Sequence, residues 1–431
     1  MYNPKTMKKL TSPSATFAAL LALLLHASAH ADTDCSQRES SRSDPTWSCH
    51  KASTWSDTCI PASAFQNWGC LELDANASLC ESSEPYHMTV YLAHSGVELD
   101  CNGQVIDHAY VDGDARRPGM RTPYSYSVED ISVKNCTIQN TGKYGIDLKR
   151  FFRGDELSGA MAGHQHIHIT NVAIVDPVQW GIYVGQNSRG VRISSVTIDG
   201  AYGGIYLESG SANSRVDKAT IVNSREREGI AVDSSFDNVI QRSYFDGNPG
   251  GLRMYRNCGE TDGQVCPITR PSGANRNLVR DCSFVNDEVR VAARMFKLYA
   301  AGFCENLDIL GYWYDKSEDN VFDGNRFDGS RLDVNDGPIV VHANEFSHGA
   351  MLELGIDEPL LWPGNGVHVT GVVAGNVFGN AAGITVQGPE SVERFENRNF
   401  AGECEPDNAC SYGATTLIGQ SVVSMGLWAI L

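Results

Sequence analysis

The stretch TIDGAYGGIYLESG, Thr197 to Gly210, decides the fold of this 431-residue chain. It joins the end of one short apolar run to a second, alternating run through a glycine-rich corner. Closely similar phrases stand upstream, AIVDPVQWGIYVGQ (173–186), and downstream, TIVNSREREGIAVDSS (220–235). Recurrence of one phrase at a period of roughly 20 to 50 residues is typical of a solenoid, in which each repeat stacks on the next.

The repeats align on the apolar residue that ends each phrase. The first five of these anchors are 36, 24, 23 and 24 residues apart: Ile138, Ile174, Ile198, Ile221 and Phe245. Further matches fall at Ile106, Phe284, Phe327, Phe378 and Phe400. The apolar positions alternate in short runs, without the leucine-rich frame or the three-and-four spacing of helical repeats. The pattern predicts short strands joined by tight corners, wound as a parallel β-helix of roughly ten coils.

Side chains beside the anchors predict how the coils pack. Two residues before an anchor the side chain is small, so we expect Cys136 and Cys282 to be buried packing residues. Asparagine tolerates the backbone of tight corners and hydrogen-bonds locally. We therefore expect the asparagines that flank the anchors to be turn residues: Asn135, Asn140, Asn171 and Asn223.

The amino-terminal residues are typical of an export signal. Lys8 and Lys9 precede the apolar run FAALLALLLHASAHA (17–31), which ends in small residues. The run falls short of the roughly 20 residues that a membrane-spanning helix needs. We expect removal of residues 1–31 and a secreted or periplasmic monomer without a membrane span.

The rest of the chain is strongly acidic. The sequence holds 34 basic and 52 acidic residues, and three of the lysines lie in 1–31, which leaves 31 against 52, or −21. This balance excludes nucleic acid as an expected partner, because phosphate binding needs positive charge. It does not exclude a locally basic groove.

The 13 cysteines, all after residue 31, predict disulfides in an exported protein. Five of them lie between Cys35 and Cys80, and the close pairs Cys258/Cys266 and Cys404/Cys410 are expected to close small loops. A structural zinc site is not supported, since the chain has no paired C-x-x-C spacing. The odd total predicts at least one cysteine that is free or pairs outside the chain.

Three phrases resemble the right-handed parallel β-helix repeats of the pectate-lyase-like superfamily: ISVKNCTIQNTGKYGIDL (131–148), VRISSVTIDGAYGGIYL (191–207) and VDKATIVNSREREGIAV (216–232). The resemblance covers roughly residues 97–400 and implies an all-β, right-handed parallel β-helix. We divide the chain into a signal peptide (1–31), a disulfide-rich cap (32–95), the β-helix (96–400) and a C-terminal cap (401–431). Such repeats occur in lyases, epimerases, hydrolases and binding proteins.

One strand of each coil has the form G-apolar-x-apolar-x. Its apolar residues face the core, and its third and fifth residues face outward in columns with neighbours about 4.8 Å apart. The first column is Asp147, Tyr183, Tyr206, Ala231 and Arg253, and the second is Lys149, Gly185, Glu208, Asp233 and Tyr255. If FKLY (296–299) is the next rung, Lys297 and Tyr299 extend the columns.

Aromatic, basic and acidic side chains on one sheet suit an acidic polysaccharide, because rings lie against sugar faces and arginine binds carboxylates in two contacts. We predict β-elimination from a uronic-acid polymer, a reaction that needs carboxylate neutralisation, a base at C5 and a proton donor. Arg253 would clamp the carboxylate, Lys297 would be the base, and Tyr206 or Tyr255 the donor. Substrate binding would involve Lys149, Tyr183, Tyr299 and Arg256. By resemblance to β-helix lyases, Glu208 and Asp233 would hold calcium.

Three other functions stay open. C5 epimerisation begins with the same proton abstraction, and hydrolysis would use Glu208 and Asp233 as its pair of carboxylic acids. A β-helix that only binds polysaccharide, or belongs to an envelope assembly, is the third. Insertions near 150–163, 257–273 and 286–320 are expected to wall a groove beside the columns, as loops on rigid scaffolds often carry function.

Overall fold

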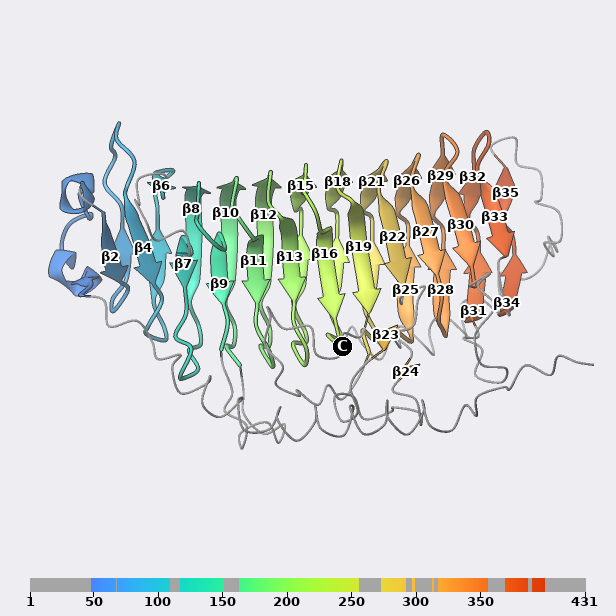
Figure 1. The fold of residues 1–431 in the computed structure, drawn as a ribbon, viewed down its shortest axis with the longest axis horizontal. Helices are drawn as coiled ribbons and strands as arrows, with labels where there is room; N and C mark the ends of the chain where they lie inside the picture. Colours follow the sequence, from blue (N-terminus) through green and yellow to red (C-terminus); the bar gives the residue numbers. More distant parts are fainter. Residues whose placement is uncertain are drawn as a thin grey trace, which may run out of the picture.

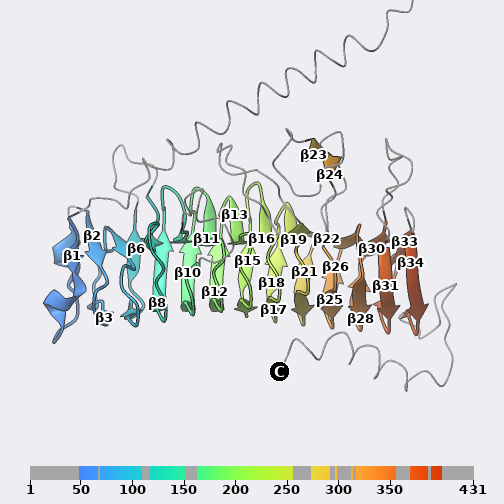
Figure 2. The same cartoon turned by 90° about the horizontal axis from the view of Figure 1, so that it is seen from below.

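The computed structural model describes residues 48–66, 68–108, 117–150, 163–255, 273–291, 297–298, 312–313, 317–355, 369–386 and 390–399. Over these ranges the chain winds into a long stack of coils (Figure 1, and from below in Figure 2). Neighbouring strands of the stack run parallel, and the only helical segments described are two short 3-10 helices: η1 (Ala52–Trp55) and η2 (Ala62–Phe65). The prediction of an all-β parallel β-helix is confirmed.

One side of the stack is a 13-stranded parallel sheet, to which each coil contributes one short strand. Its strands follow one another in this order: β1 (His50–Lys51), β2 (Gly69–Glu72), β4 (Met88–Tyr91), β7 (Met120–Arg121), β9 (Ile146–Leu148), β11 (Trp180–Val184), β13 (Gly203–Leu207), β16 (Glu228–Asp233), β19 (Gly250–Tyr255), β22 (Glu288–Val291), β27 (Arg331–Val334), β30 (Met351–Leu354) and β33 (Gly383–Val386). We call its outward side the site face.

The rest of each coil forms two further parallel stacks. They merge where one strand runs along both: β8 (Ser132–Gln139), β10 (His168–Val175) and β12 (Arg192–Asp199). In the other coils the two stacks are formed by separate strands. The first stack, which we call the second face, holds β3 (Ala77–Ser78), β5 (Glu98–Asp100), β14 (Arg215–Asp217), β17 (Val239–Gln241), β20 (Leu278–Arg280), β25 (Asn320–Asp323), β28 (Ile339–His342), β31 (Val369–Ala374) and β34 (Glu390–Phe395). The other holds β6 (Val105–Asp107), β15 (Thr220–Val222), β18 (Tyr244–Asp246), β21 (Ser283–Val285), β26 (Arg326–Asp328), β29 (Glu345–Ser347), β32 (Val377–Phe378) and β35 (Arg398–Asn399).

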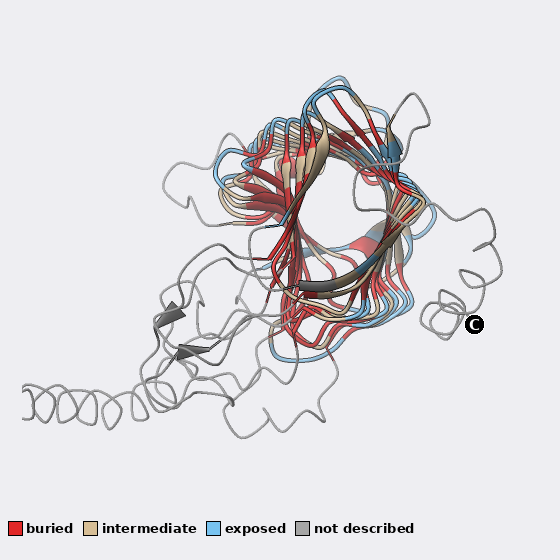
Figure 3. Ribbon diagram, turned by 90° about the vertical axis from the view of Figure 1, so that its right-hand side faces the viewer, coloured by how far each residue is buried: buried red, intermediate tan, exposed pale blue. Residues whose placement is uncertain are grey.

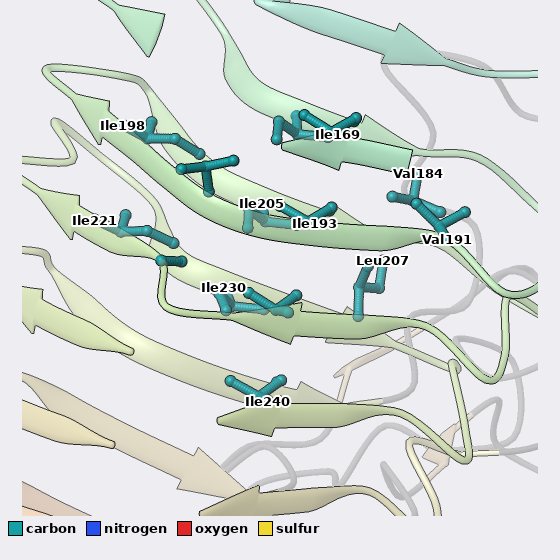
Figure 4. Packing of buried hydrophobic residues seen from close by; sticks show 14 of the residues in the cluster. Ile169, Val184, Val191, Ile193, Ile198, Ile205, Leu207, Ile221, Ile230 and Ile240 are labelled. Atoms are coloured by element: carbon teal, nitrogen blue, oxygen red, sulfur yellow. The ribbon is translucent and has the colours of Figure 1, made fainter. Parts of the chain in front are cut away.

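The interior of the coils is filled by columns of identical or similar side chains. Figure 4 shows isoleucine, valine and leucine side chains that successive coils contribute to the interior, and Figure 3, a view along the stack, shows buried residues in the strands on all sides of the coil. The anchors lie in one column, as predicted: Ile138 pairs with Ile174, and Ile174 with Ile198. From Phe245 onward the anchors are stacked phenylalanines with ring centroids 4.7 to 5.2 Å apart: Phe245, Phe284, Phe327, Phe346 and Phe378.

Two anchor predictions need correction. Phe346 is an anchor that the alignment of phrases missed, because its coil is only 19 residues long from Phe327. At the other end of the column, Phe378 pairs with Asn399, so the anchor position belongs to Asn399 and not to its neighbour Phe400. Asparagine corners are confirmed: Asn135, Asn140, Asn171 and Asn223 all have positive φ, between 52° and 56°.

Disulfides join successive coils near the start of the stack. Cys49–Cys70 and Cys59–Cys80 each span 21 residues, one turn of the coil, and β1 pairs with β2 in the same register. Cys136 is buried as expected, but it is bonded to Cys101 of the preceding coil. Cys282 is buried and free, and burial raises the pKa of its thiol to about 12. The pairs Cys258/Cys266 and Cys404/Cys410 lie outside the described residues, which contain no helix long and apolar enough to cross a membrane.

Candidate functional site

The site face carries the two predicted columns. Strand pairing aligns Asp147 with Tyr183, Tyr183 with Tyr206, Tyr206 with Ala231 and Ala231 with Arg253. In the second column Asp233 pairs with Tyr255. The first column is therefore confirmed from β9 to β19, and the second is confirmed for its last pair. Tyr206, Asp233 and Tyr255 lie on the adjacent strands β13, β16 and β19.

The columns continue differently from the prediction after Arg253. The next strand is β22, in which Arg290 pairs with Arg253, and the column runs on through Asp333 and Glu353. Lys297 lies instead in β23 (Lys297–Leu298), which pairs antiparallel with β24 (Tyr312–Trp313) in a separate sheet. Placing Lys297 in the column is therefore wrong, since β22 already hydrogen-bonds to β19. Tyr299 and Arg256 lie outside the described residues.

The number of residues between an anchor and the next site-face strand would have identified β22. The site-face strand begins 5 residues after its anchor in β13 and β19, and 4 residues after Phe284 in β22. The residue Phe296 that opens FKLY lies 12 residues after Phe284. Both EVRV and FKLY alternate, so alternation alone could not decide between them.

Aromatic rings form a row along the first part of the site face. The ring centroids of Tyr144 and Tyr183 are 5.2 Å apart, and those of Tyr183 and Tyr206 are stacked at 4.8 Å. Trp180 lies with its ring centroid 5.0 Å from that of Tyr206. It fits there because its strand neighbour is Gly203, where a Cβ would come within 2.5 Å of the Trp180 ring. These rings, with Ala231 and Tyr255, form a buried apolar cluster outside the coil interior.

A tyrosine–aspartate pair lies at the centre of this row. The Tyr206 hydroxyl donates a short hydrogen bond to Asp233 Oδ2, and Ser234 Oγ donates to Asp233 Oδ1 at 3.2 Å. Both Tyr206 and Asp233 are buried although their strands point them outward. In a buried site with low effective dielectric, a charge-assisted hydrogen bond of this kind is stronger than it is in water. The pair is therefore held in a defined geometry.

Two cations lie beside the aromatic row. Lys149 Nζ donates to the Tyr144 hydroxyl at 2.8 Å and lies 3.9 Å from the Tyr183 ring centroid, a cation–π contact. Arg227 NH2 donates to the Tyr255 hydroxyl at 3.4 Å. Burial by itself would lower the pKa of Arg227, but the adjacent Glu228 carboxylate outweighs it and raises that pKa. Lys149 thus contacts the aromatic row at Tyr183, and Arg227 contacts it at Tyr255 while it also binds Glu228 at 3.2 Å.

Farther along the face, arginines and carboxylates form a ladder of ion pairs. Arg253 NH1 donates to Glu228 at 2.9 Å, and Arg253 NH2 lies 3.5 Å from Glu288. Arg290 contacts Glu288 at 2.6 Å and Asp333 at 3.1 Å. Burial would raise the pKa of Glu288, but Arg290 and Arg331 more than offset this effect and hold it below its usual value. Arg253, predicted to be the carboxylate clamp, therefore already has two carboxylate partners.

Glu208 and Asp233 do not by themselves form a calcium site. Asp233 accepts hydrogen bonds from Tyr206 and Ser234, and Glu208 accepts one from Gln186 at 3.2 Å. Calcium takes six to eight oxygen ligands. Among the residues that the structure describes, no group of three or more His, Cys, Asp or Glu side chains is placed to hold a metal ion. Calcium binding stays a prediction, and no step below depends on it.

Several residues of the site face were not predicted from the sequence. Tyr144, Trp180, Arg227 and Glu228 precede the G-apolar-x-apolar phrase, and they contact the outward residues. Tyr144 packs on Tyr183, Trp180 packs on Tyr206, and Glu228 binds Arg253. In five successive coils the position before the phrase holds Tyr144, Trp180, Gly203, Glu228 and Gly250. The large or charged residues at three of these five positions are a signal that the sequence contains.

The family comparison decides the classification. The model for the right-handed β-helix region matches residues 124–388, well over half of the chain. This chain belongs to the right-handed β-helix family. No curated protein matches the sequence. The family match covers the coils from β8 to β33, which contain the aromatic row and the ion-pair ladder.

Solved structures with a similar coil are distant in sequence. The catalytic domain of a GH87 α-1,3-glucanase in complex with nigerose is 12% identical at a TM-score of 0.46, over 79% of this β-helix chain and 64% of the glucanase domain. This chain thus spans less than two thirds of that domain. An alginate lyase from Paenibacillus sp. str. FPU-7 is 12% identical at a TM-score of 0.37, over 80% and 98% of the two chains. An endo-xylogalacturonan hydrolase from Aspergillus tubingensis is also 12% identical, at 0.40, over 80% and 88%.

Proposed function

We propose that this β-helix protein is an exported enzyme that cleaves an acidic polysaccharide by β-elimination at the site face. The observation that carries the proposal is the buried Tyr206–Asp233 hydrogen bond in a row of aromatic rings that Lys149 contacts at Tyr183 and Arg227 contacts at Tyr255. The three disulfides of the first coils fit an oxidising compartment outside the cytoplasm.

In the proposed reaction, the base at C5 is Tyr206 rather than Lys297, because Lys297 is not in the outward column. The Tyr206 oxygen takes the C5 proton as its own phenolic proton passes to Asp233. The C5 electron pair forms the C4=C5 double bond, and the C4–oxygen bond breaks. Tyr255, on the strand next to Asp233, gives its proton to the leaving oxygen, and Arg227 favours the resulting phenolate.

Binding is proposed to use stacking and positive charge together. The exposed edges of Tyr183 and Trp180, whose rings pack on Tyr206, would contact sugar rings, and Lys149 would neutralise the uronate carboxylate whose charge grows as the C5 proton leaves. Arg253 would act less as a clamp than predicted, since Glu228 and Glu288 hold its guanidinium. Its exposed part would then contact the polymer beyond the cleavage point.

Hydrolysis is the second candidate, on one specific observation. Glu208 directly follows β13 and Asp233 ends the neighbouring strand β16, and the residues before them, Leu207 and Val232, are paired. Adjacent strands are about 4.8 Å apart. That spacing is close to the roughly 5 Å between the two carboxyl groups of retaining glycoside hydrolases. In this alternative Asp233 and Glu208, and not Tyr206, carry the reaction.

The test is a mutation series with two readouts on a panel of uronic-acid polymers. Ultraviolet absorbance reports new C=C bonds, and a reducing-end assay reports any chain cleavage. We expect Tyr206→Phe to lower the rate of absorbance increase by roughly 10²- to 10⁴-fold, the contribution typical of a proton-transfer group. Tyr244→Phe is the matched control, because Tyr244 is an exposed tyrosine on another face that also hydrogen-bonds an aspartate.

Each alternative has its own result. New reducing ends without ultraviolet absorbance, lost in both Glu208→Gln and Asp233→Asn, would establish hydrolysis and overturn elimination. Elimination that survives in Tyr206→Phe would place the base elsewhere. Absence of both signals with every polymer would leave binding without cleavage.

A further inference from the structure

The second face carries an unusual concentration of positive charge in a protein whose net charge is −18. Three successive coils contribute the segments 189–195, 212–218 and 236–242 to this face. Together these segments contain five cations and two carboxylates. We call the cations, which are all exposed, the basic strip: Arg189, Arg192, Arg215, Lys218 and Arg242.

Most of this charge is not neutralised within the protein. Asp217 binds Arg242 at 2.8 Å, and Asp237 binds Arg276 of the next coil at 2.7 Å, so both carboxylates have arginine partners. In the described part of the chain, Arg189, Arg192, Arg215 and Lys218 make no ion pair with a carboxylate. Arg189 lies 5.6 Å from the Phe236 ring centroid, and Arg215 interacts electrostatically with Asp217. These four cations on adjacent coils therefore remain without a carboxylate in direct contact.

The arrangement of two of these cations is unfavourable for the protein alone. Arg192 and Arg215 are direct partners in the parallel pairing of β12 with β14. Neighbouring strands of a sheet are about 4.8 Å apart. Like charges placed directly opposite on adjacent strands destabilise a sheet. His168 precedes them in the same column, and its pKa is lowered, first by burial and then by Arg192.

The site face, by contrast, uses its arginines internally. Arg253 and Arg290 are bound by Glu228, Glu288 and Asp333. The basic strip lies on a different side of the coil, after the corner that follows the site-face strand, so a ligand on it would not occupy the Tyr206–Asp233 pair. Arg192 and Arg215 repeat once at the coil spacing, and the other cations lie beside them on the same coils. Cations spread over three coils fit a polymer with several anionic groups better than a single small anion.

We propose that the basic strip is a second, non-catalytic binding site for an anionic polysaccharide, which holds the polymer on the second face while the site face acts on another part of it. The inference goes beyond the proposed function, because it assigns a ligand to a face with no catalytic groups. It shares the substrate class of the proposed function but does not require elimination to occur.

The test measures binding of sodium alginate and of polygalacturonate to the full chain, at low and at high salt. The variant Arg192→Ala/Arg215→Ala should bind at least one of these polymers roughly tenfold more weakly at low salt. The control is Arg326→Ala/Arg398→Ala, which removes the same formal charge from exposed positions on β26 and β35, outside the second face; Arg326 contacts Asp328 at 3.4 Å. The control should bind like the unaltered protein, and added salt should remove most of the difference.

Cleavage of a short uronate oligosaccharide separates this inference from the proposed function. Such an oligosaccharide should be cleaved at the same rate by the unaltered protein and by Arg192→Ala/Arg215→Ala, because it needs only the site face. The proposal for the basic strip would be overturned if both double variants lost polymer binding equally. It would also be overturned if neither polymer bound to the unaltered protein. Failure of cleavage alone would count against the proposed function and leave the binding result valid.

Discussion

Asp287 is a buried carboxylate in an interior ladder whose neighbouring members, Asn248 and Ser330, are neutral. Its Oδ1 accepts the Asn248 backbone N–H at 2.8 Å, and its Oδ2 accepts Asn248 Nδ2 at 3.0 Å. Burial nevertheless raises the pKa of Asp287 to about 6 from an ordinary value of 3.8. The folded protein therefore binds this proton more tightly than the unfolded chain does.

The direction of the pH effect follows from this difference. As the pH rises from about 4 to about 6, the group loses its proton in the unfolded state first, and folding becomes less favourable by about 2 to 3 kcal/mol. We expect Asp287→Asn to raise the free energy of unfolding at pH 7 by about 1 to 3 kcal/mol and to change it little at pH 4. Urea denaturation at the two pH values measures this, and an equal effect at both would contradict it.

At the scale of strands and corners, the interior is organised by ladders of asparagine. Asn344 Oδ1 accepts both the backbone N–H of Asn325, at 2.9 Å, and its Nδ2, at 3.0 Å. Asn344 Nδ2 in turn donates to Asn376 Oδ1 and to the Phe322 carbonyl, each at 3.0 Å. Each amide thus satisfies buried backbone groups of the coil before it and passes the same role to the coil after it.

Removing one amide should cost more than a single hydrogen bond, because it leaves buried donors without partners. We expect Asn344→Ala to lower the free energy of unfolding by about 2 to 4 kcal/mol. Asn223→Ala, at an exposed corner with φ of 55°, should cost only about 1 kcal/mol. Chemical denaturation of the two variants compares them, and equal losses would show that the ladder adds nothing beyond corner geometry.

The repeat pattern of strands and corners predicts some parts of the molecule and leaves others out. Anchors and outward columns follow from alternation within a strand and from the repeat, so the order Asp147, Tyr183, Tyr206, Ala231, Arg253 was available from the sequence. Burial of Tyr206 and Asp233 was not, and neither was the Arg290–Asp333 ion pair, which joins residues 43 positions apart. The burial and the ion pair depend on side-chain conformations, which a repeat pattern does not predict. Lys297 was misplaced because an insertion hid the coil spacing.

At the scale of the whole molecule, stability is a sum over neighbouring coils, and the first coils are reinforced covalently. Cys49–Cys70 and Cys59–Cys80 each close a loop of 21 residues between consecutive coils, and each is expected to contribute about 3 kcal/mol. Reduction should therefore loosen the start of the stack first. Hydrogen exchange after reduction should speed up in β2 and β4 and stay unchanged in β16 and β19. Uniform acceleration along the whole stack would show a single cooperative unit instead.

Elimination through Tyr206 at the site face can be followed by ultraviolet absorbance with uronic-acid polymers. We expect a rising absorbance from new C=C bonds with the unaltered protein and with Tyr244→Phe, and a nearly flat trace with Tyr206→Phe. A flat trace with the unaltered protein for every polymer, or full activity in Tyr206→Phe, would contradict it.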